Sequence, residues 1–169
     1  MSQMRTLRTE PLTAEAFAPF GQVLQTGSGD ANMNQGTAVR LDRCAALVST
    51  RSGCAPNLAM VHALPQALPM PLRLLERHPC SSQAFIPLQC SRYLVVVAPT
   101  AASGLPDWAG LRAFVARPGQ GINYTAGTWH HPFTALDAPA DLAMLAWEDG
   151  TAKDCEEQKL PEPITVVET

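Results

Sequence analysis

The sequence is poor in charge and contains no basic run. Charged residues occupy 16% of the 169 positions, and the 12 lysines and arginines are outnumbered by 15 acids. Because nucleic-acid surfaces need clustered positive charge, nucleic acid is not expected as a partner. No segment approaches the roughly 20 apolar residues of a membrane span, and the N-terminal residues are too charged for a signal peptide. We therefore expect a cytoplasmic protein with no membrane partner.

Cysteine patterns that build structure are also missing. The five cysteines are odd in number and form no C-x-x-C pair, which excludes a disulfide framework and a thiolate zinc site. We interpret them as reduced thiols, in agreement with a cytoplasmic location.

Long helices are not expected, because 15 of the 169 residues are proline. This is about 9%, where about 5% is usual, and proline interrupts a helix. One short helix is predicted at 13–18, and residues 26–36 have no hydrophobic period and predict a loop. Short β-like runs separated by turn residues predict a barrel or sandwich in a single domain spanning 1–169. These runs are 22–24, 45–50, 58–63, 83–87, 93–98, 111–115, 122–124 and 141–147.

Imidazole chemistry has few sources, because the chain has only four histidines. Glu76 and His78 are two residues apart, so they share a face if this run is a strand. Gln83 opens the next strand-like run, and a glycine-punctuated turn far downstream precedes His130. We expect these four side chains to meet inside one small barrel.

The spacing resembles the two metal-binding motifs of cupins, H-x-H-x(3,4)-E and G-x(5)-P-x-G-x(2)-H. The first is matched here by Glu76, His78 and Gln83, and the second by the turn from Gly119 to His130. The strings ERHPCSSQAFIPL, YLVVVAP, LRAF and QGINYTAGTWHHP are more specific and resemble the ureidoglycolate lyase family, over nearly the whole chain. The resemblance implies a mainly β protein, a cupin-type double-stranded β-helix (jelly-roll) barrel with a short N-terminal helix.

The family resemblance also implies an activity. It implies a homodimeric enzyme that cleaves the C–N bond of (S)-ureidoglycolate, a small-molecule substrate, to glyoxylate and urea in allantoin degradation. It further implies a divalent metal, nickel by family association, and no organic cofactor. Glu76, His78, Gln83 and His130 are its expected ligands, because imidazole nitrogens with carboxylate and amide oxygens suit a borderline divalent ion. The residues themselves do not select nickel over manganese, iron or zinc.

Further site residues are proposed beside this set. Glu76, His78, His130 and Tyr124 are the predicted catalytic residues, with Tyr124 as acid or hydrogen-bond donor, although an aromatic at a strand end usually serves packing. Gln83 is also a predicted substrate-binding residue. For the substrate carboxylate, Arg40, Arg92, Arg112 or the metal could serve, and spacing does not choose among them. Arg112 and His62 are named as the substrate-binding residues beside Gln83.

Neighbouring histidines on a strand face opposite sides. The motif assigns the inward position to His130, and His131 is then expected to orient its neighbour or donate to a carbonyl.

The sequence departs from the family pattern in places that bear on the substrate. Thr125 stands where relatives have histidine, His62 where they tend to have arginine, Cys90 where glycine is common, and Trp147-Glu148 near a usual D-R-G. Two alternatives therefore stay open. One is a cupin enzyme acting on a related ureido or hydroxy acid, and the other is a non-catalytic cupin that binds a small carboxylate.

Overall fold

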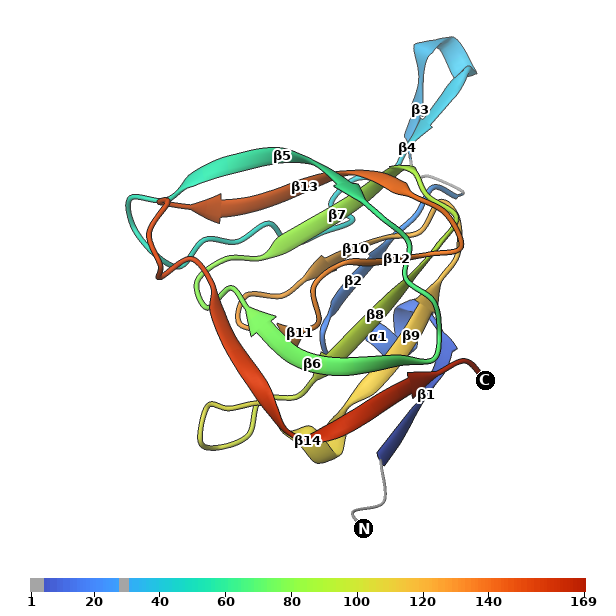
Figure 1. Cartoon of the computed structure of the whole chain (residues 1–169). Coiled ribbons are helices and arrows are strands. Elements are labelled where there is room, and N and C mark those ends of the chain that lie inside the picture. Colours follow the sequence, from blue (N-terminus) through green and yellow to red (C-terminus); the bar gives the residue numbers. More distant parts are fainter. Residues whose placement is uncertain (1–4, 28–30) are drawn as a thin grey trace.

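The protein consists almost entirely of β-strands in the computed structural model, which describes residues 5–27 and 31–169 (Figure 1). The helices are α1 (Ala14–Phe17) and the two 3₁₀ turns η1 (Asn34–Gly36) and η2 (Trp108–Gly110). The strands are β1 (Arg5–Pro11), β2 (Gly21–Leu24), β3 (Ala31–Met33), β4 (Ala38–Arg40), β5 (Ala55–Ala63), β6 (Met70–Arg77), β7 (Gln83–Gln89), β8 (Arg92–Ala98), β9 (Arg112–Ala116), β10 (Gly121–Tyr124), β11 (Trp129–His130), β12 (Thr134–Leu136), β13 (Ala140–Glu148) and β14 (Glu156–Val167).

The larger sheet closes on itself. Its strands follow the order β11-β6-β14-β1-β9-β8-β12, and β11 also pairs with β8, so six strands form a ring from which β12 extends. Strand β1 is parallel to both of its neighbours, β14 and β9. This closed barrel, with one short α-helix, confirms the predicted fold class of a mainly β, cupin-type barrel.

A second, five-stranded sheet has the order β2-β10-β7-β13-β5 and crosses the upper part of Figure 1. The core between the two sheets includes Phe85 and Leu142 from this sheet and Phe114 from the larger one. A second core draws its strand residues from the larger sheet alone. Strand β8 serves both cores, because its odd-numbered residues from Tyr93 to Val97 enter the first and its even-numbered residues enter the second.

The short helix follows the prediction closely. Thr13 caps it by accepting a hydrogen bond from the Ala16 backbone N–H at 3.1 Å, and Phe17 is fully buried against Phe114 and Tyr124. No helix among residues 5–27 and 31–169 has the length and hydropathy needed to cross a membrane.

Most predicted strands are confirmed, with small shifts at their ends, but the strand expected at 45–50 is wrong. Only an isolated bridge from Ser49 to Ser81 forms there. Backbone N–H groups of this segment donate to side chains instead of to a neighbouring strand. The Ala46 N–H donates to the Gln22 side chain, and the Val48 N–H donates to the Ser82 hydroxyl at 2.9 Å. The segment therefore lies over the sheet edge without joining it.

The loop expected at 26–36 is also corrected where the structure describes it; residues 28–30 lie outside the described part. Strands β3 and β4 pair with each other as a two-stranded hairpin that projects from the body (Figure 1). Its turn uses left-handed backbone at Asn34, Gln35 and Gly36. Met33 and Val39 remain exposed, and the absence of a buried face explains the absence of a hydrophobic period.

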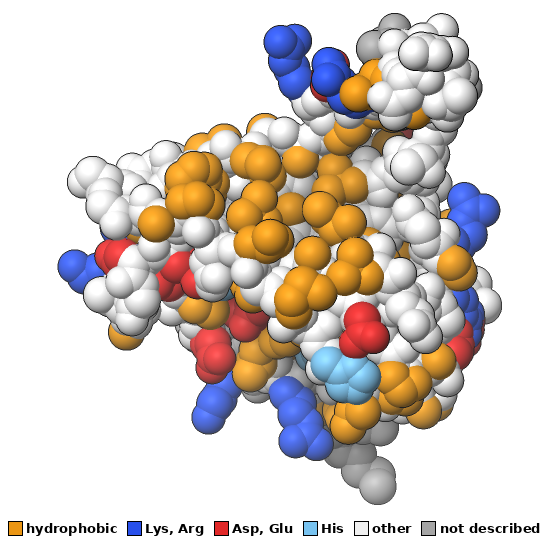
Figure 2. All heavy atoms as spheres, turned by 90° about the horizontal axis from the view of Figure 1, so that it is seen from above, with side chains coloured by type: hydrophobic (Ala, Val, Ile, Leu, Met, Phe, Trp, Pro, Cys, Tyr) orange, Lys and Arg blue, Asp and Glu red, His pale blue; other side chains and the backbone are white. Residues whose placement is uncertain are grey.

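The outer face of the five-stranded sheet carries exposed apolar side chains. Leu58 and Met60 of β5 are each 68% exposed, and Ile86 and Leu88 of β7 are exposed as well. Met60 and Ile86 lie in one row across β13, since both pair with Ala143. Figure 2 shows hydrophobic side chains gathered on the face that the top view presents. We call Leu58, Met60, Ile86 and Leu88 the outer apolar patch.

Candidate active site

Three predicted site residues meet where β6 and β11 pair. Glu76 lies directly opposite His130 in the antiparallel register, and His78 follows two residues after Glu76. Glu76 Oε1 is 3.5 Å from His130 Nε2, and one ligand atom from each of Glu76, His78 and His130 lies within 4.8 Å of the others. The two imidazole rings stack with centroids 5.7 Å apart. The structure thus brings together residues that are 54 positions apart.

Both imidazoles present the same nitrogen to the cluster. His78 Nδ1 lies 2.9 Å from the Asp154 carbonyl oxygen, and His130 Nδ1 lies 2.9 Å from the Thr128 carbonyl oxygen. Because a carbonyl only accepts, each Nδ1 carries the hydrogen and each neutral ring keeps a lone pair on Nε2. Both Nε2 atoms are buried and have no hydrogen-bond partner. Orphaned acceptors of this kind are the groups that ligate a metal or bind a substrate.

Gln83 and Tyr124 come to the same region from the five-stranded sheet, where they are paired in the register of β7 and β10. Gln83 is buried, and its Oε1 also has no hydrogen-bond partner. The Tyr124 ring stacks on the His130 imidazole, with centroids 4.0 Å apart and planes 14° apart. This contact holds the His130 ring plane, and burial raises the pKa of the Tyr124 phenol well above its ordinary value.

The pKa values of Glu76 and His78 are both lowered by their surroundings. Burial by itself raises the pKa of Glu76, but the adjacent His130 and the nearby His78 outweigh it, so the Glu76 pKa is lowered overall. Burial, and then repulsion from His130, lowers the pKa of His78. Near neutral pH the cluster therefore offers a carboxylate beside a neutral imidazole, the protonation states that a cation needs.

The donor atoms suit a divalent metal. Two unpartnered imidazole Nε2 atoms and the Glu76 carboxylate form a mixed nitrogen and oxygen set, and the unpartnered amide oxygen of Gln83 belongs to the strand position paired with Tyr124. Such a set fits borderline ions such as nickel, iron or zinc and is a poor match for thiolate-preferring ions. These are the four residues that the motif spacing predicts.

Nearby thiols add no further nucleophile. Cys155 Sγ lies 3.9 Å from Glu76 Oε2, and burial together with Glu76 raises its pKa to about 11, so it stays a thiol at neutral pH. Burial also raises the pKa of Cys90.

His131 points away from its neighbour. Its Nδ1 lies 2.9 Å from the Pro132 carbonyl oxygen, which confirms the expectation that this imidazole donates to a carbonyl. The Thr134 hydroxyl is 3.2 Å from the same nitrogen. His131 follows the end of β11 at His130, and its Nδ1 is engaged outside the Glu76, His78 and His130 cluster.

The structure places the two predicted carboxylate-binding residues elsewhere. His62 is exposed on β5, with Nδ1 2.6 Å from Asp141 Oδ1, and the two-residue period puts it on the same outer face as Met60. Arg112 forms a bidentate ion pair with Glu10 and donates to the Ala16 carbonyl oxygen. These contacts engage both side chains outside the Glu76 cluster, and their role in substrate binding stays a prediction.

Sequence reasoning missed one pair near the cluster. Asn57 Nδ2 donates to Glu148 Oε2 at 2.7 Å, and Glu148 is close enough to raise the pKa of His78, although burial dominates and the net shift is downward. The two-residue period of a strand could have indicated that Glu148 faces inward, because it lies an even number of residues from the buried Leu142 and Ala146 on β13.

The fold and cluster define a class, a cupin-type β-barrel with a metal-competent glutamate and two histidines. A family model for ureidoglycolate lyase matches residues 4–167, so the chain belongs to the ureidoglycolate lyase family. It is 41% identical to a ureidoglycolate lyase of Burkholderia mallei (strain NCTC 10229) over 162 residues, which cover 95% of this chain and 93% of that one. Identity to the Burkholderia cepacia protein of that name is 44% over 159 residues, covering 93% and 88% of the two chains. The Pseudomonas syringae pv. tomato protein of that name is 41% identical over 162 residues, covering 94% and 92%.

Proposed function

We propose that this protein is a lyase that cleaves the C–N bond of (S)-ureidoglycolate to give glyoxylate and urea. The observation that carries the proposal is the buried Glu76, His78 and His130 cluster, with two unpartnered Nε2 atoms, in a member of the ureidoglycolate lyase family. The substrate is a hemiaminal. Its cleavage transfers the carbinol proton to a base, forms the aldehyde C=O bond, breaks the C–N bond and delivers a proton to the departing urea nitrogen.

In this proposal the chain supplies both proton-transfer groups. Glu76 accepts the carbinol proton through its carboxylate. Tyr124, whose ring stacks on His130, donates a proton toward the departing nitrogen and regains it from the protonated Glu76. The Nε2 atoms of His78 and His130 are acceptors that either hold the metal described below or, without it, accept from the substrate hydroxyl, and Gln83 contributes its amide oxygen. The buried position of the two histidines excludes bulk water from the reacting atoms.

A divalent metal is part of the proposal. Glu76, His78, Gln83 and His130 would hold it, and when bound it would supply a Lewis acid for the carbinol oxygen. Glu76 would be both a ligand and the proton acceptor, since a carboxylate has two oxygens. Nickel is the metal that the family resemblance names, and the donor set is compatible with it.

We also propose that the protein is a homodimer and that the outer apolar patch is covered by a second copy. Two features support this: a patch of large apolar side chains is unusual on a monomer, and a groove lined by Val39, Leu41 and Ile86 adjoins it at the base of the projecting hairpin. The second copy would bury both. The cytoplasmic location and the single-domain organisation stay predictions from the sequence.

The test of the lyase activity is release of urea and glyoxylate from each ureidoglycolate enantiomer, corrected for uncatalysed decay of the hemiaminal. The protein is stripped with chelator and resupplied with nickel, manganese or zinc. Turnover of the S form restored by metal supports the full proposal, whereas turnover indifferent to metal retains the lyase and removes the metal from it. Binding of glyoxylate without turnover of either enantiomer would contradict the lyase and support a carboxylate-binding cupin.

A further inference from the structure

The segment between β13 and β14 is closed by its own hydrogen bonds. The Asp154 carboxylate accepts from the backbone N–H groups of Asp149 and Gly150, the latter at 2.7 Å. Asp149 in turn accepts from both the N–H and the hydroxyl of Thr151, at 3.0 and 2.6 Å. These bonds fix the backbone of residues 149–154 as one turn.

Arg51, about 100 residues earlier in the chain, binds this turn from outside. Its guanidinium forms ion pairs with Asp154 and with Asp149, the latter at 3.1 Å, and donates to the Lys153 carbonyl oxygen at 3.0 Å. Its Nε also donates to Cys54 Sγ at 3.2 Å. Cys54, Asp149 and Asp154 have the spacing of a metal site, but the guanidinium is already the cation that their atoms surround. We therefore assign this cluster a supporting role.

The network ends at the candidate active site. The backbone carbonyl of Asp154, whose carboxylate Arg51 holds, accepts the hydrogen bond from His78 Nδ1. His78 lies beyond the end of β6, so no strand pairing orients its imidazole. The position of one carbonyl oxygen thus sets both the tautomer of His78 and the direction of its Nε2 toward Glu76.

We propose that Arg51 and Asp154 are positioning residues for His78: the ion pair holds the Asp154 carbonyl where it fixes the His78 imidazole as the Nδ1–H tautomer. The activity consequence rests on the proposed lyase function, but the tautomer and the metal affinity do not. Loss of an outer partner of a ligand histidine typically costs about 10 to 100-fold in metal affinity or activity. We expect an effect of that size when Arg51 is removed.

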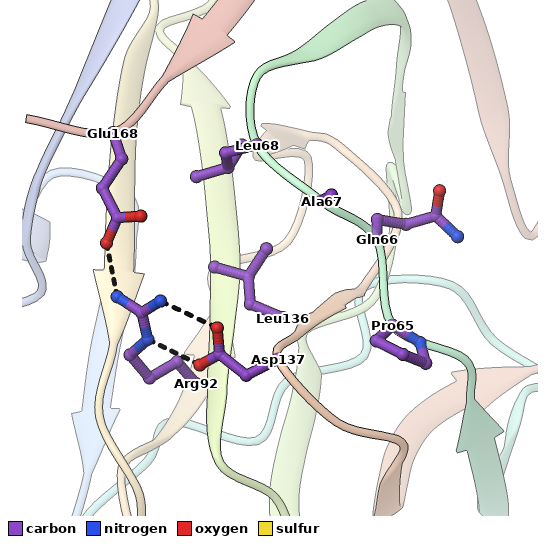
Figure 3. A pocket seen from close by; sticks show the side chains of 8 residues that line it. All are labelled: Pro65, Gln66, Ala67, Leu68, Arg92, Leu136, Asp137 and Glu168. Atoms are coloured by element: carbon purple, nitrogen blue, oxygen red, sulfur yellow. Dashed lines mark hydrogen bonds and ion pairs between the residues drawn. The ribbon is translucent and has the colours of Figure 1, made fainter.

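The chain offers a matched control. Arg92 is held by Asp137 and Glu168 in a similar arrangement, at a surface cavity whose lining includes none of Glu76, His78 and His130 (Figure 3). Arg92→Ala therefore removes an arginine clamped by two carboxylates without touching the support of His78.

The experiment compares Arg51→Ala, Arg51→Lys and Asp154→Asn with wild type and Arg92→Ala. The ¹⁵N shifts of the imidazoles in metal-stripped protein report each histidine tautomer, and calorimetry with nickel reports metal affinity. We expect the His78 signals of Arg51→Ala to move toward a tautomer mixture while those of His130 stay fixed. Nickel affinity and kcat should both fall about 10 to 100-fold, with partial rescue in Arg51→Lys.

Several outcomes would overturn the proposal. The first is that Arg51→Ala gives the same His78 signals as Arg92→Ala and a nickel affinity within twofold of it. The second is that the His78 and His130 signals of Arg51→Ala shift equally, because this would indicate a general loss of order and not a specific effect on His78. If Arg51→Ala does not fold, Arg51→Lys and Asp154→Asn decide the question by the same spectra. A wild-type protein with no lyase activity contradicts the proposed function, while the tautomer measurement still tests the role of Arg51.

Discussion

Polar side chains are usually exposed and large apolar ones buried, and the two faces of the five-stranded sheet depart from this in opposite ways. On its inner face, polar Gln83 is buried with an unpartnered oxygen, close to the buried imidazole of His130. On its outer face, Leu58 and Met60 stay exposed although they are large and apolar. Buried polar atoms and exposed apolar patches are the informative exceptions among surface and core residues.

The difference shows that one sheet carries two kinds of binding surface. The inner exception is polar and enclosed, so it suits a small ligand or metal with several donor contacts. The outer exception is flat and apolar, which suits a large partner surface. Strand β7 contributes to both, since alternate residues such as Phe85 and Ile86 face opposite sides.

The largest expected effect separates two adjacent histidines. His130→Ala should lower kcat by roughly 10³-fold, because it removes the Nε2 that faces the cluster, and it should also lower the melting temperature, because the buried ring stacks on Tyr124 and bonds the Thr128 carbonyl oxygen. His131→Ala should keep most activity and lower stability, because His131 bonds the Pro132 carbonyl. Turnover and thermal unfolding of both variants check this. The opposite order would show that His131 carries the chemistry.

The second effect compares two side chains of β7. Phe85→Ala should destabilise the protein by about 3–5 kcal/mol, because its ring is buried against Tyr124 and Phe133. Leu88→Ala, at an exposed position of the same strand, should cost less than about 0.5 kcal/mol in a monomer. Urea unfolding at several protein concentrations measures both. A larger, concentration-dependent cost for Leu88→Ala would show that a second copy buries it.

The site was more predictable than the strands around it. Motif spacing located Glu76, His78 and His130 because strand pairing converts fixed sequence intervals into neighbouring positions, as the Glu76–His130 register shows. Strands β1 and β14 were missed, since each contains a proline, Pro11 or Pro161 and Pro163, and no clean alternation. Strand β1 pairs with β9 and β14 across more than a hundred residues, and β14 pairs with β6 across about 80 to 95 residues, so no local pattern indicates these pairings.

The contacts that orient the site were beyond sequence reasoning. The acceptors of the two Nδ1–H groups are backbone carbonyls, of Asp154 and Thr128, and any residue type supplies a carbonyl. Likewise Arg112 and Glu10 are about a hundred residues apart, and their ion pair depends on the parallel pairing of β1 with β9. Charge alone gave no means of choosing among the arginines.

A third prediction tests the outer face by charge. Met60→Glu places a carboxylate in the centre of the outer apolar patch, so a dimer formed there should dissociate while catalysis within each chain continues. Sedimentation velocity should change from dimer to monomer, and activity per chain should change less than about threefold. Asp107→Ala, a change on the η2 turn outside the patch, is the control. An unchanged dimer in Met60→Glu would place the interface elsewhere.

The smallest expected effect concerns the ion pair of Arg92 and Asp137, which lies on neither face of the five-stranded sheet. It shows how much an ordinary surface ion pair contributes to stability. The Arg92 guanidinium, through its hydrogen bonds, lowers the pKa of Asp137. A lowered folded pKa means that this contribution is complete above the unfolded value of about 3.9 and is lost as pH falls through the folded value. The pair is substantially solvated, so the contribution should be small. The melting temperatures of wild type and Asp137→Asn should therefore begin to converge below about pH 4 and meet only below the lowered folded pKa. Because asparagine also tolerates the positive φ of 65° at this position, a difference that does not shrink as the pH falls would mean that Asp137 stabilises the protein through something other than its charge.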